Sequence, residues 1–232
     1  MATVTPILEE LQMLGTAQTR KTYRRHGVGE NVFGVSYADL YKLRKRIKVD
    51  HDLAQTLWAS GNYEARILAT MIADPHATDA TLLATWARDL DNYAVADALA
   101  GFAAQTAAAH AVMAAWTQDE GEWTGAAGWA LLAALATHDT AQPDAYFMPY
   151  LEVITREIHA RPNRVRYAMN NALIAIGRRN PMLQTVALAA AARIGTVVVD
   201  HGATACKTPV AAAAIQKTRP ARAGTARHAQ PA

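Results

Sequence analysis

Three aromatic residues recur in this sequence at an interval of 30 residues, at Tyr63, Tyr93 and Trp123. A tryptophan precedes each of them, and these tryptophans are spaced 28 and 30 residues apart. Repeats of this length are typical of arrays of helical hairpins, each made of a helix, a short polar turn and a second helix. A single hairpin cannot bury its apolar face, whereas stacked hairpins share a continuous core. The spacing therefore predicts an all-α solenoid with a concave inner face.

Within each unit, the second helix is marked by apolar residues at helical spacing, such as Val95, Leu99 and Phe102. Hydrophobic residues make up 51% of the chain, and the many alanines among them favour helices that pack closely. Asp91 is the expected N-cap of this middle helix. A fourth unit is expected to begin at Asn163, after a longer insertion, with Asn163 as its N-cap.

The segments on either side of these units predict further helices. Their expected ranges are 6–15, 19–26, 36–47, 182–193 and 208–217. Residues 27–35 are expected to form a loop, and a short β-prone run at 196–200 opens a non-repetitive loop at about 196–209. We thus expect one repeat domain over residues 1–217. The Ala, Arg, Pro and Gly mixture of residues 218–232 predicts a disordered tail.

Positive charge is concentrated near the two ends of the chain, although the net charge is only +3. Residues 20–48 hold nine Lys or Arg and two acidic residues, and residues 161–193 hold six Arg and no acidic residue. No acidic residue follows Asp200. Basic ends on an elongated molecule suit a polyanion such as DNA laid along it. Ordinary solvated helix faces would give the same pattern, so charge alone leaves both interpretations open.

The chain has a single cysteine, Cys206, which excludes a disulfide framework and a zinc site built from several cysteines. It shows neither a signal peptide nor a membrane-spanning segment, so we expect a soluble, cytoplasmic protein. The HExxH, GxSxG, P-loop and dinucleotide-binding motifs are absent. Asp200 and His201 lie near Cys206 in the non-repetitive loop, where a capping role is favoured over a metal site.

One helix face carries a candidate for chemistry. Tyr93 and Asp97 are four residues apart, so they are neighbours on one surface of the helix that begins near Asn92. Small residues beside them, including Ala100 and Gly101, allow a large partner to approach closely. An aromatic ring next to a carboxylate can contact a sugar and stabilise positive charge that develops there. The structural alternative is that Tyr93 packs between repeats and Asp97 makes an inter-repeat hydrogen bond.

Several segments, taken in order, resemble the AlkD-type family of DNA alkylation-repair glycosylases. Residues 33–44 resemble the family's N-terminal "GV…LR" signature, and residues 52–69 resemble its next repeat. Tyr93 and Asp97 match the place where the family has an aromatic residue four positions before its catalytic aspartate. Residues 166–181 are similar to a later family helix. The likeness covers about residues 5–195.

This resemblance implies a right-handed solenoid of HEAT-like repeats that binds damaged duplex DNA on its concave face, without reading sequence. It implies release of N3- or N7-alkylated purines, such as 3-methyladenine or 7-methylguanine, with no metal or cofactor. Asp97 would be the catalytic carboxylate. The substrate would contact Tyr93, Tyr23, Trp123 and Asn171. The DNA phosphates would contact Arg44, Lys45, Arg161, Arg164, Arg166, Arg178 and Arg179. We expect a monomer, associated with the nucleoid when bound to DNA.

Two departures from the family pattern keep alternatives open. The family has arginines after its next tryptophan, where this chain has residues 125–127, Gly-Ala-Ala, after Trp123. A later family helix carries a tryptophan where this chain has Asn170 and Asn171. The leading hypothesis is therefore a monofunctional DNA glycosylase. Its alternatives are a catalytically inactive solenoid that recognises distorted duplex, and a protein-interaction scaffold.

Overall fold

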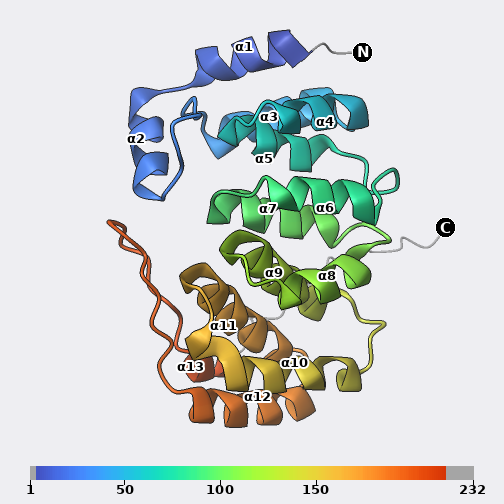
Figure 1. The fold of residues 1–232 in the computed structure, drawn as a ribbon, viewed down its shortest axis with the longest axis vertical. Coiled ribbons are helices and arrows are strands. Elements are labelled where there is room, and N and C mark those ends of the chain that lie inside the picture. Colours follow the sequence, from blue (N-terminus) through green and yellow to red (C-terminus); the bar gives the residue numbers. More distant parts are fainter. Residues whose placement is uncertain (1–3, 218–232) are drawn as a thin grey trace, which may run out of the picture.

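The computed structural model describes residues 4–217, which form helical hairpins stacked along one long axis (Figure 1). Four hairpins make up the centre of the array: α4 (His51–Ala59) with α5 (Tyr63–Ile72), α6 (Ala80–Arg88) with α7 (Tyr93–Ala103), α8 (Ala109–Gln118) with α9 (Glu122–His138), and α10 (Asp144–Glu157) with α11 (Asn163–Gly177). Three helices precede them: α1 (Val4–Leu14), α2 (Ala17–Arg25) and α3 (Tyr37–Ile47). After them come α12 (Pro181–Ile194) and α13 (Ala211–Gln216). The α-solenoid predicted from the repeat is confirmed.

Three details of the sequence prediction are corrected. The fourth hairpin begins with α10, so the expected insertion is its first helix and Asn163 starts its second. The side chain of Asn163 caps no helix end because it hydrogen-bonds the backbone of Asp200 instead. Asn92, and not Asp91, caps α7 by accepting from the backbone N–H groups of its first turn. The β-prone run at 196–200, expected to be too short for a sheet of its own, is extended and forms no strand within residues 4–217.

Beyond the last helix, the predicted tail at 218–232 lies outside the described residues. No helix within residues 4–217 is both long and apolar enough to cross a lipid bilayer.

Two of the three repeat tryptophans, Trp58 of α4 and Trp86 of α6, lie at the centre of the core between the first two central hairpins. Trp58 stacks on Trp86 with ring centroids 4.4 Å apart and planes only 3° from parallel, and Phe102 lies 5.8 Å from Trp86. All three rings are almost completely buried. Aromatic stacking adds to the burial of apolar area, which explains why tryptophan recurs at the repeat interval.

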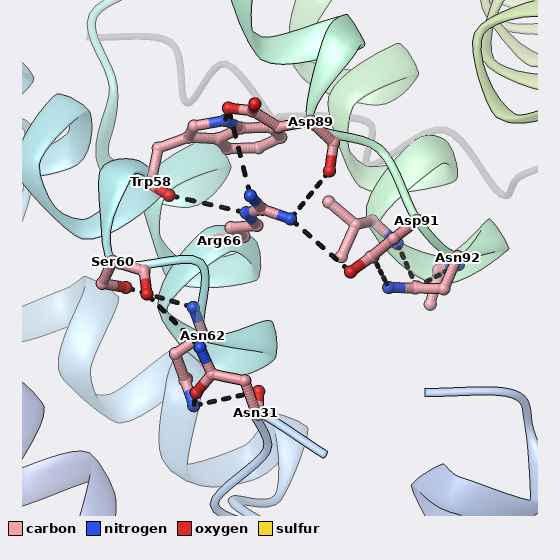
Figure 2. A network of polar contacts seen from close by, with 10 residues as sticks. Asn31, Trp58, Ser60, Asn62, Arg66, Asp89, Asp91 and Asn92 are labelled. Carbon is pink, nitrogen blue, oxygen red and sulfur yellow. Dashed lines mark hydrogen bonds and ion pairs between the residues drawn. The ribbon is translucent and has the colours of Figure 1, made fainter. Parts of the chain in front are cut away.

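A polar network at the turns fixes where the next hairpin sits (Figure 2). Arg66 of α5 donates to the Asp89 carbonyl oxygen at 2.8 Å and lies 3.7 Å from the Asp91 carboxylate. The Asp89 carboxylate also accepts the indole N–H of Trp58 at 2.9 Å. These contacts tie the α6–α7 turn to the preceding hairpin. They thereby position Asn92, which caps α7 one residue before Tyr93.

Small residues allow the helices in the middle of the array to approach closely. A Cβ atom on Gly128 of α9 would lie 2.5 Å from the backbone of Trp116 and Thr117, and one on Gly125 would lie 3.1 Å from Val165 of α11. Real side chains do not tolerate the first distance, so α9 needs glycine where it crosses α8. This packing explains the richness of the chain in alanine and the placement of glycine where α9 crosses its neighbours.

A fully buried carboxylate organises the loop before α3. Glu64 of α5 accepts hydrogen bonds from the backbone N–H groups of Phe33, Gly34 and Val35. Gly34 has a φ of +88°, and a Cβ there would lie 2.3 Å from the Thr16 carbonyl oxygen. The loop therefore fits its place because of one glycine and one buried charge.

We expect Glu64→Gln to lower the free energy of unfolding by about 2–3 kcal/mol, because an amide accepts at only one of its two ends and leaves a buried N–H unpaired. Urea unfolding followed by circular dichroism measures the change. The matched control is Glu9→Gln at an exposed site on α1, which should change stability by less than about 0.5 kcal/mol. Equal effects of the two substitutions would contradict the anchoring role of Glu64.

Candidate functional site

Two hollows adjoin α7, and Tyr93 and Asp97 line both of them. The first, the arginine hollow, has a volume of about 600 Å³. Its lining residues are Arg24, Arg25, His26, Gly27, Tyr93, Asp97, Glu122, Trp123, Asn163, Arg164, Arg166, Tyr167, Asp200, His201, Gly202, Thr204 and Cys206. The second, the tyrosine hollow, has a volume of about 820 Å³ and lies between α3, α5, α7 and the turn at 73–76. Asp97 thus stands where the two hollows meet.

The carboxylate of Asp97 combines access to solvent with an unusual protonation equilibrium. Its side chain is exposed, yet the walls of both hollows surround it and displace much of its water. This desolvation raises the pKa of Asp97 to about 6, while the positive charge of Arg164 acts in the opposite direction. A carboxylate that lines a cleft and has a shifted pKa is often part of a functional site.

Next to Asp97, a guanidinium lies between two aromatic rings. Arg164 of α11 is 4.0 Å from the ring centroid of Tyr93 and 4.7 Å from that of Tyr167. The hydroxyl of Tyr93 also lies 2.6 Å from Nδ1 of His26. Stacking and cation–π attraction hold a guanidinium in place while its N–H edge stays available to an anion.

Arg164, one of the residues expected to contact phosphate, reaches the site from α11 and not from the position where the resemblance places the family's arginines. The family's arginines would fall at residues 125–127, but these are buried in the packing of α9 against its neighbours. A long side chain has no room there. In this chain, Arg164 and Arg166 reach the hollow from α11 instead. The two arginines of α11 therefore supply positive charge that the sequence comparison predicted to be missing.

Three of the arginines predicted to bind phosphate are held by the protein's own carbonyl groups. Arg161 donates to the Asp119 carbonyl oxygen at 2.6 Å, and Arg178 donates to that of Ala214. Arg179 donates to the carbonyl oxygens at the end of α9 and lies 4.3 Å from the ring of Phe147. These contacts cap helices, so the phosphate role predicted for the three residues is not supported. Their sequence gave no sign of this because each acceptor lies far along the chain.

The remaining predicted residues are spread over the molecule. Arg44 lines the tyrosine hollow, and Lys45 is exposed on α3 outside both hollows. Trp123 lines the arginine hollow. The other two lie elsewhere. Asn171 lines a separate hollow near the end of α11, and Tyr23 packs on Tyr63 while its hydroxyl donates to the Val35 carbonyl oxygen at 2.8 Å. The expected substrate contacts are therefore not supported for Tyr23 and Asn171.

The non-repetitive loop reaches across to the opposite end of the array. Figure 1 shows it projecting from α12 toward α2, where Arg25 donates to the Ala203 carbonyl oxygen at 3.1 Å. At its base, Asn163 exchanges two hydrogen bonds with the backbone of Asp200, of 2.8 and 2.7 Å. Asn170, one of the two asparagines that stand where the resemblance places a family tryptophan, donates to the Pro209 carbonyl oxygen. The loop forms one wall of the arginine hollow.

Sequence reasoning did not single out several residues of this hollow. They are Arg24, Arg25, His26, Glu122 and Tyr167. The basic run at 20–25 was a signal for the first two, but nothing local marked the others. Among the described residues, no three His, Cys, Asp or Glu side chains come close enough to hold a metal ion together.

Comparison with known proteins connects this geometry to DNA. A solved structure described as "a new family of proteins related to the HEAT-like repeat DNA glycosylases with affinity for branched DNA structures" matches with a TM-score of 0.85 and 29% identity, over 93% of each chain. Two uncharacterised proteins, from Listeria innocua and Listeria monocytogenes, are each 28% identical over 94% of this chain and 98% of their own length. The family model for DNA alkylation repair enzymes matches residues 7–214. With its stacked helical hairpins and its carboxylate between two hollows, this chain belongs to the DNA alkylation repair enzyme family.

Proposed function

We propose that this protein is a DNA glycosylase that hydrolyses the N-glycosidic bond of N3- or N7-alkylated purines in duplex DNA. The observation that carries the proposal is the position of Asp97, a solvent-accessible carboxylate between two hollows, beside an aromatic ring and a stacked guanidinium. Membership of the DNA alkylation repair family supports the substrate class.

The reaction requires the protein mainly to place a negative charge near the sugar and to position the attacking water. An N3- or N7-alkylated purine is already cationic, so it leaves as a neutral base and takes the electron pair of the C1′–N bond. Positive charge then develops on the deoxyribose, where the Asp97 carboxylate stabilises it. Water forms the new bond to C1′ and gives up a proton, for which Asp97 is an available acceptor. Tyr93 would form a wall against the sugar.

The arginine hollow suits the phosphate backbone on either side of the lesion. α7, α9 and α11 all begin at it, and their N-termini add partial positive charge to that of Arg24, Arg25, Arg164 and Arg166. Contacts of this kind give affinity without reading sequence, which is what recognition of damage requires.

Binding of branched DNA without base release is the second candidate. The observation in its favour is the likeness to a protein family described as having affinity for branched DNA structures. The loop that reaches α2 also forms one wall of the arginine hollow, and a walled hollow would favour DNA that can bend or splay. The two candidates differ in the role of Asp97: a glycosylase needs it for base release, whereas a protein that only binds DNA does not.

We expect Asp97→Asn to lower the rate of 7-methylguanine or 3-methyladenine release from alkylated duplex by about 100-fold or more, because the neutral amide no longer stabilises charge on the sugar. Chromatography of the freed base measures release, and fluorescence anisotropy measures duplex affinity, which should stay within about threefold. Asp52→Asn, at an exposed site on α4, serves as the control and should keep full activity. Absence of release by the wild type would overturn the glycosylase proposal, and tighter binding of a four-way junction than of duplex would then support the second candidate.

Release should also depend on pH through the ionisation of Asp97. Because the carboxylate must be charged, we expect the enzyme-dependent rate to fall as the pH is lowered through about 6. Arg164 lowers the pKa of Asp97, so Arg164→Gln should move the midpoint to higher pH. Rates at constant ionic strength, corrected for loss of base without enzyme, test this. A midpoint that stays in place or moves to lower pH in the variant would contradict the predicted coupling.

Stability should depend on pH in a related way. The pKa of Asp97 is higher in the folded protein than in the unfolded chain, so its protonation favours folding. This favourable contribution is complete below the unfolded pKa and is lost as the pH rises through about 6. Asp97→Asn should therefore be slightly more stable than the wild type at pH 7.5, by less than about 1 kcal/mol because the side chain is exposed. Urea unfolding at pH 7.5 and 4.5 would show the gain shrinking at the lower pH, and a gain equal at both would contradict it.

A further inference from the structure

His26 is a polar residue of the arginine hollow that the proposed chemistry does not use. Its Nδ1 lies 2.6 Å from the hydroxyl oxygen of Tyr93, so the two side chains share a hydrogen bond whichever of them carries the proton. The two residues are 67 positions apart in the sequence. Among the described residues, His26 is the one hydrogen-bond partner of that hydroxyl. The ring next to Asp97 is therefore fixed from α2.

Two helices from opposite ends of the array hold the Tyr93 ring. His26 reaches its hydroxyl from the end of α2, and the guanidinium of Arg164 on α11 lies 4.0 Å from its ring centroid. α7 itself gives the ring little support, because the small residues Ala94 and Gly101 line the tyrosine hollow beside it. A tyrosine side chain without such contacts can exchange among staggered rotamers. The orientation of the ring therefore depends on His26 and Arg164.

The end of α2 sets the position of His26. The backbone N–H of His26 donates to the Tyr23 carbonyl oxygen at 2.9 Å and so closes the helix. None of the residues of α2 is buried, so the place of this helix in the array depends on contacts of a few side chains. Arg25, the neighbour of His26, donates to the Ala203 carbonyl oxygen of the non-repetitive loop at 3.1 Å. The loop therefore braces the helix end that carries His26.

A purely structural tie between α2 and α7 is the alternative role for this hydrogen bond. α7 does not depend on such a tie, because Val95 and Leu99 are completely buried and already fix it in the core. The hydrogen bond lies instead at the wall of the arginine hollow, which His26 and Tyr93 line together with Asp97. Its location favours a role in the site.

We propose that His26 is a positioning residue, which acts through Tyr93 and holds that ring against the deoxyribose next to Asp97. Tyr93 and Asp97 are four residues apart on α7 and line the same two hollows, so a ring that turned away would admit water beside the carboxylate. Water there weakens the attraction between the carboxylate and a positive charge on the sugar. This assignment rests on the proposed function for the identity of the reaction, and it adds a residue of α2 to the site.

The experiment measures binding to duplexes in which a sugar analogue without a base replaces one nucleotide. One analogue is a pyrrolidine whose protonated nitrogen carries positive charge at the position of C1′, and the other is an uncharged tetrahydrofuran. The ratio of the two dissociation constants, measured by fluorescence anisotropy, reports how well the site stabilises positive charge on the sugar, and it requires no base release. We expect the wild type to bind the pyrrolidine duplex about tenfold more tightly.

The variants separate the two ring nitrogens of His26. His26→Asn keeps a hydrogen-bonding atom near the place of Nδ1, whereas His26→Gln places one near Nε2. We expect His26→Ala and Tyr93→Phe each to lower the preference to about twofold, and the double variant to lower it no further, because both substitutions remove the same hydrogen bond. His26→Asn should restore most of the preference, and His26→Gln should not. His138→Ala, at an exposed site at the end of α9, is the matched control and should keep it.

Base release by the same proteins gives a second measurement. His26→Ala should slow release at saturating enzyme by about tenfold, while its affinity for undamaged duplex changes by less than about twofold. A residue that only ties α2 to α7 would instead alter affinity for all duplexes alike.

The outcomes separate this inference from the proposed function. If the wild type shows no preference for the pyrrolidine duplex, or His26→Ala keeps that preference, the positioning role is overturned even where base release is observed. Restoration by His26→Gln as complete as that by His26→Asn would overturn the assignment to Nδ1. A preference that is lost in both His26→Ala and Tyr93→Phe and regained in His26→Asn supports the role, even in a protein that releases no base.

Discussion

The close approach of α9 to its neighbours is the constraint on which the rest of this structure depends. α9 can lie against α8 only because glycine occupies the crossing point at Gly128, and Gly125 gives it close contact with Val165 of α11. That packing places the N-termini of α7, α9 and α11 around one hollow. It also leaves no space for an arginine on the buried face of α9. The arrangement of charge in the site is thus a consequence of how tightly the core is built.

The site has two kinds of surface, one on either side of Asp97. On one side, guanidinium groups and helix N-termini provide positive charge for phosphates. On the other, tyrosine rings provide apolar area, with carboxylates nearby. Asp97 belongs to both environments, and the crowding that raises its pKa also places it where charge would develop on a sugar. A stability cost at such a residue is usual for functional groups.

The resemblance to DNA alkylation-repair glycosylases and the departures from it have one physical explanation. Arg164 stands between Tyr93 and Tyr167, in a position that residues 125–127 cannot supply because they are buried. At the pair Asn170–Asn171, where the resemblance places a tryptophan, Asn170 holds the end of the non-repetitive loop through the Pro209 carbonyl oxygen. In this chain, arginines of α11 therefore supply positive charge to the site, and the non-repetitive loop forms one of its walls.

The sequence by itself determined the repeat, the helices and the pairing of Tyr93 with Asp97, because these depend on periodicity and on neighbours within one helix. It also indicated the DNA alkylation repair family, through the order of short motifs along the chain. Only the tertiary structure decided which arginines face the site and which cap helices, because the sequence does not show which acceptor each guanidinium contacts. The contact between Arg25 and Ala203 joins residues 178 positions apart, and no local pattern records such a distance. The grouping of Tyr37, Tyr41 and Asp97 around one hollow is of the same kind, because α3, α5 and α7 must pack before their side chains meet.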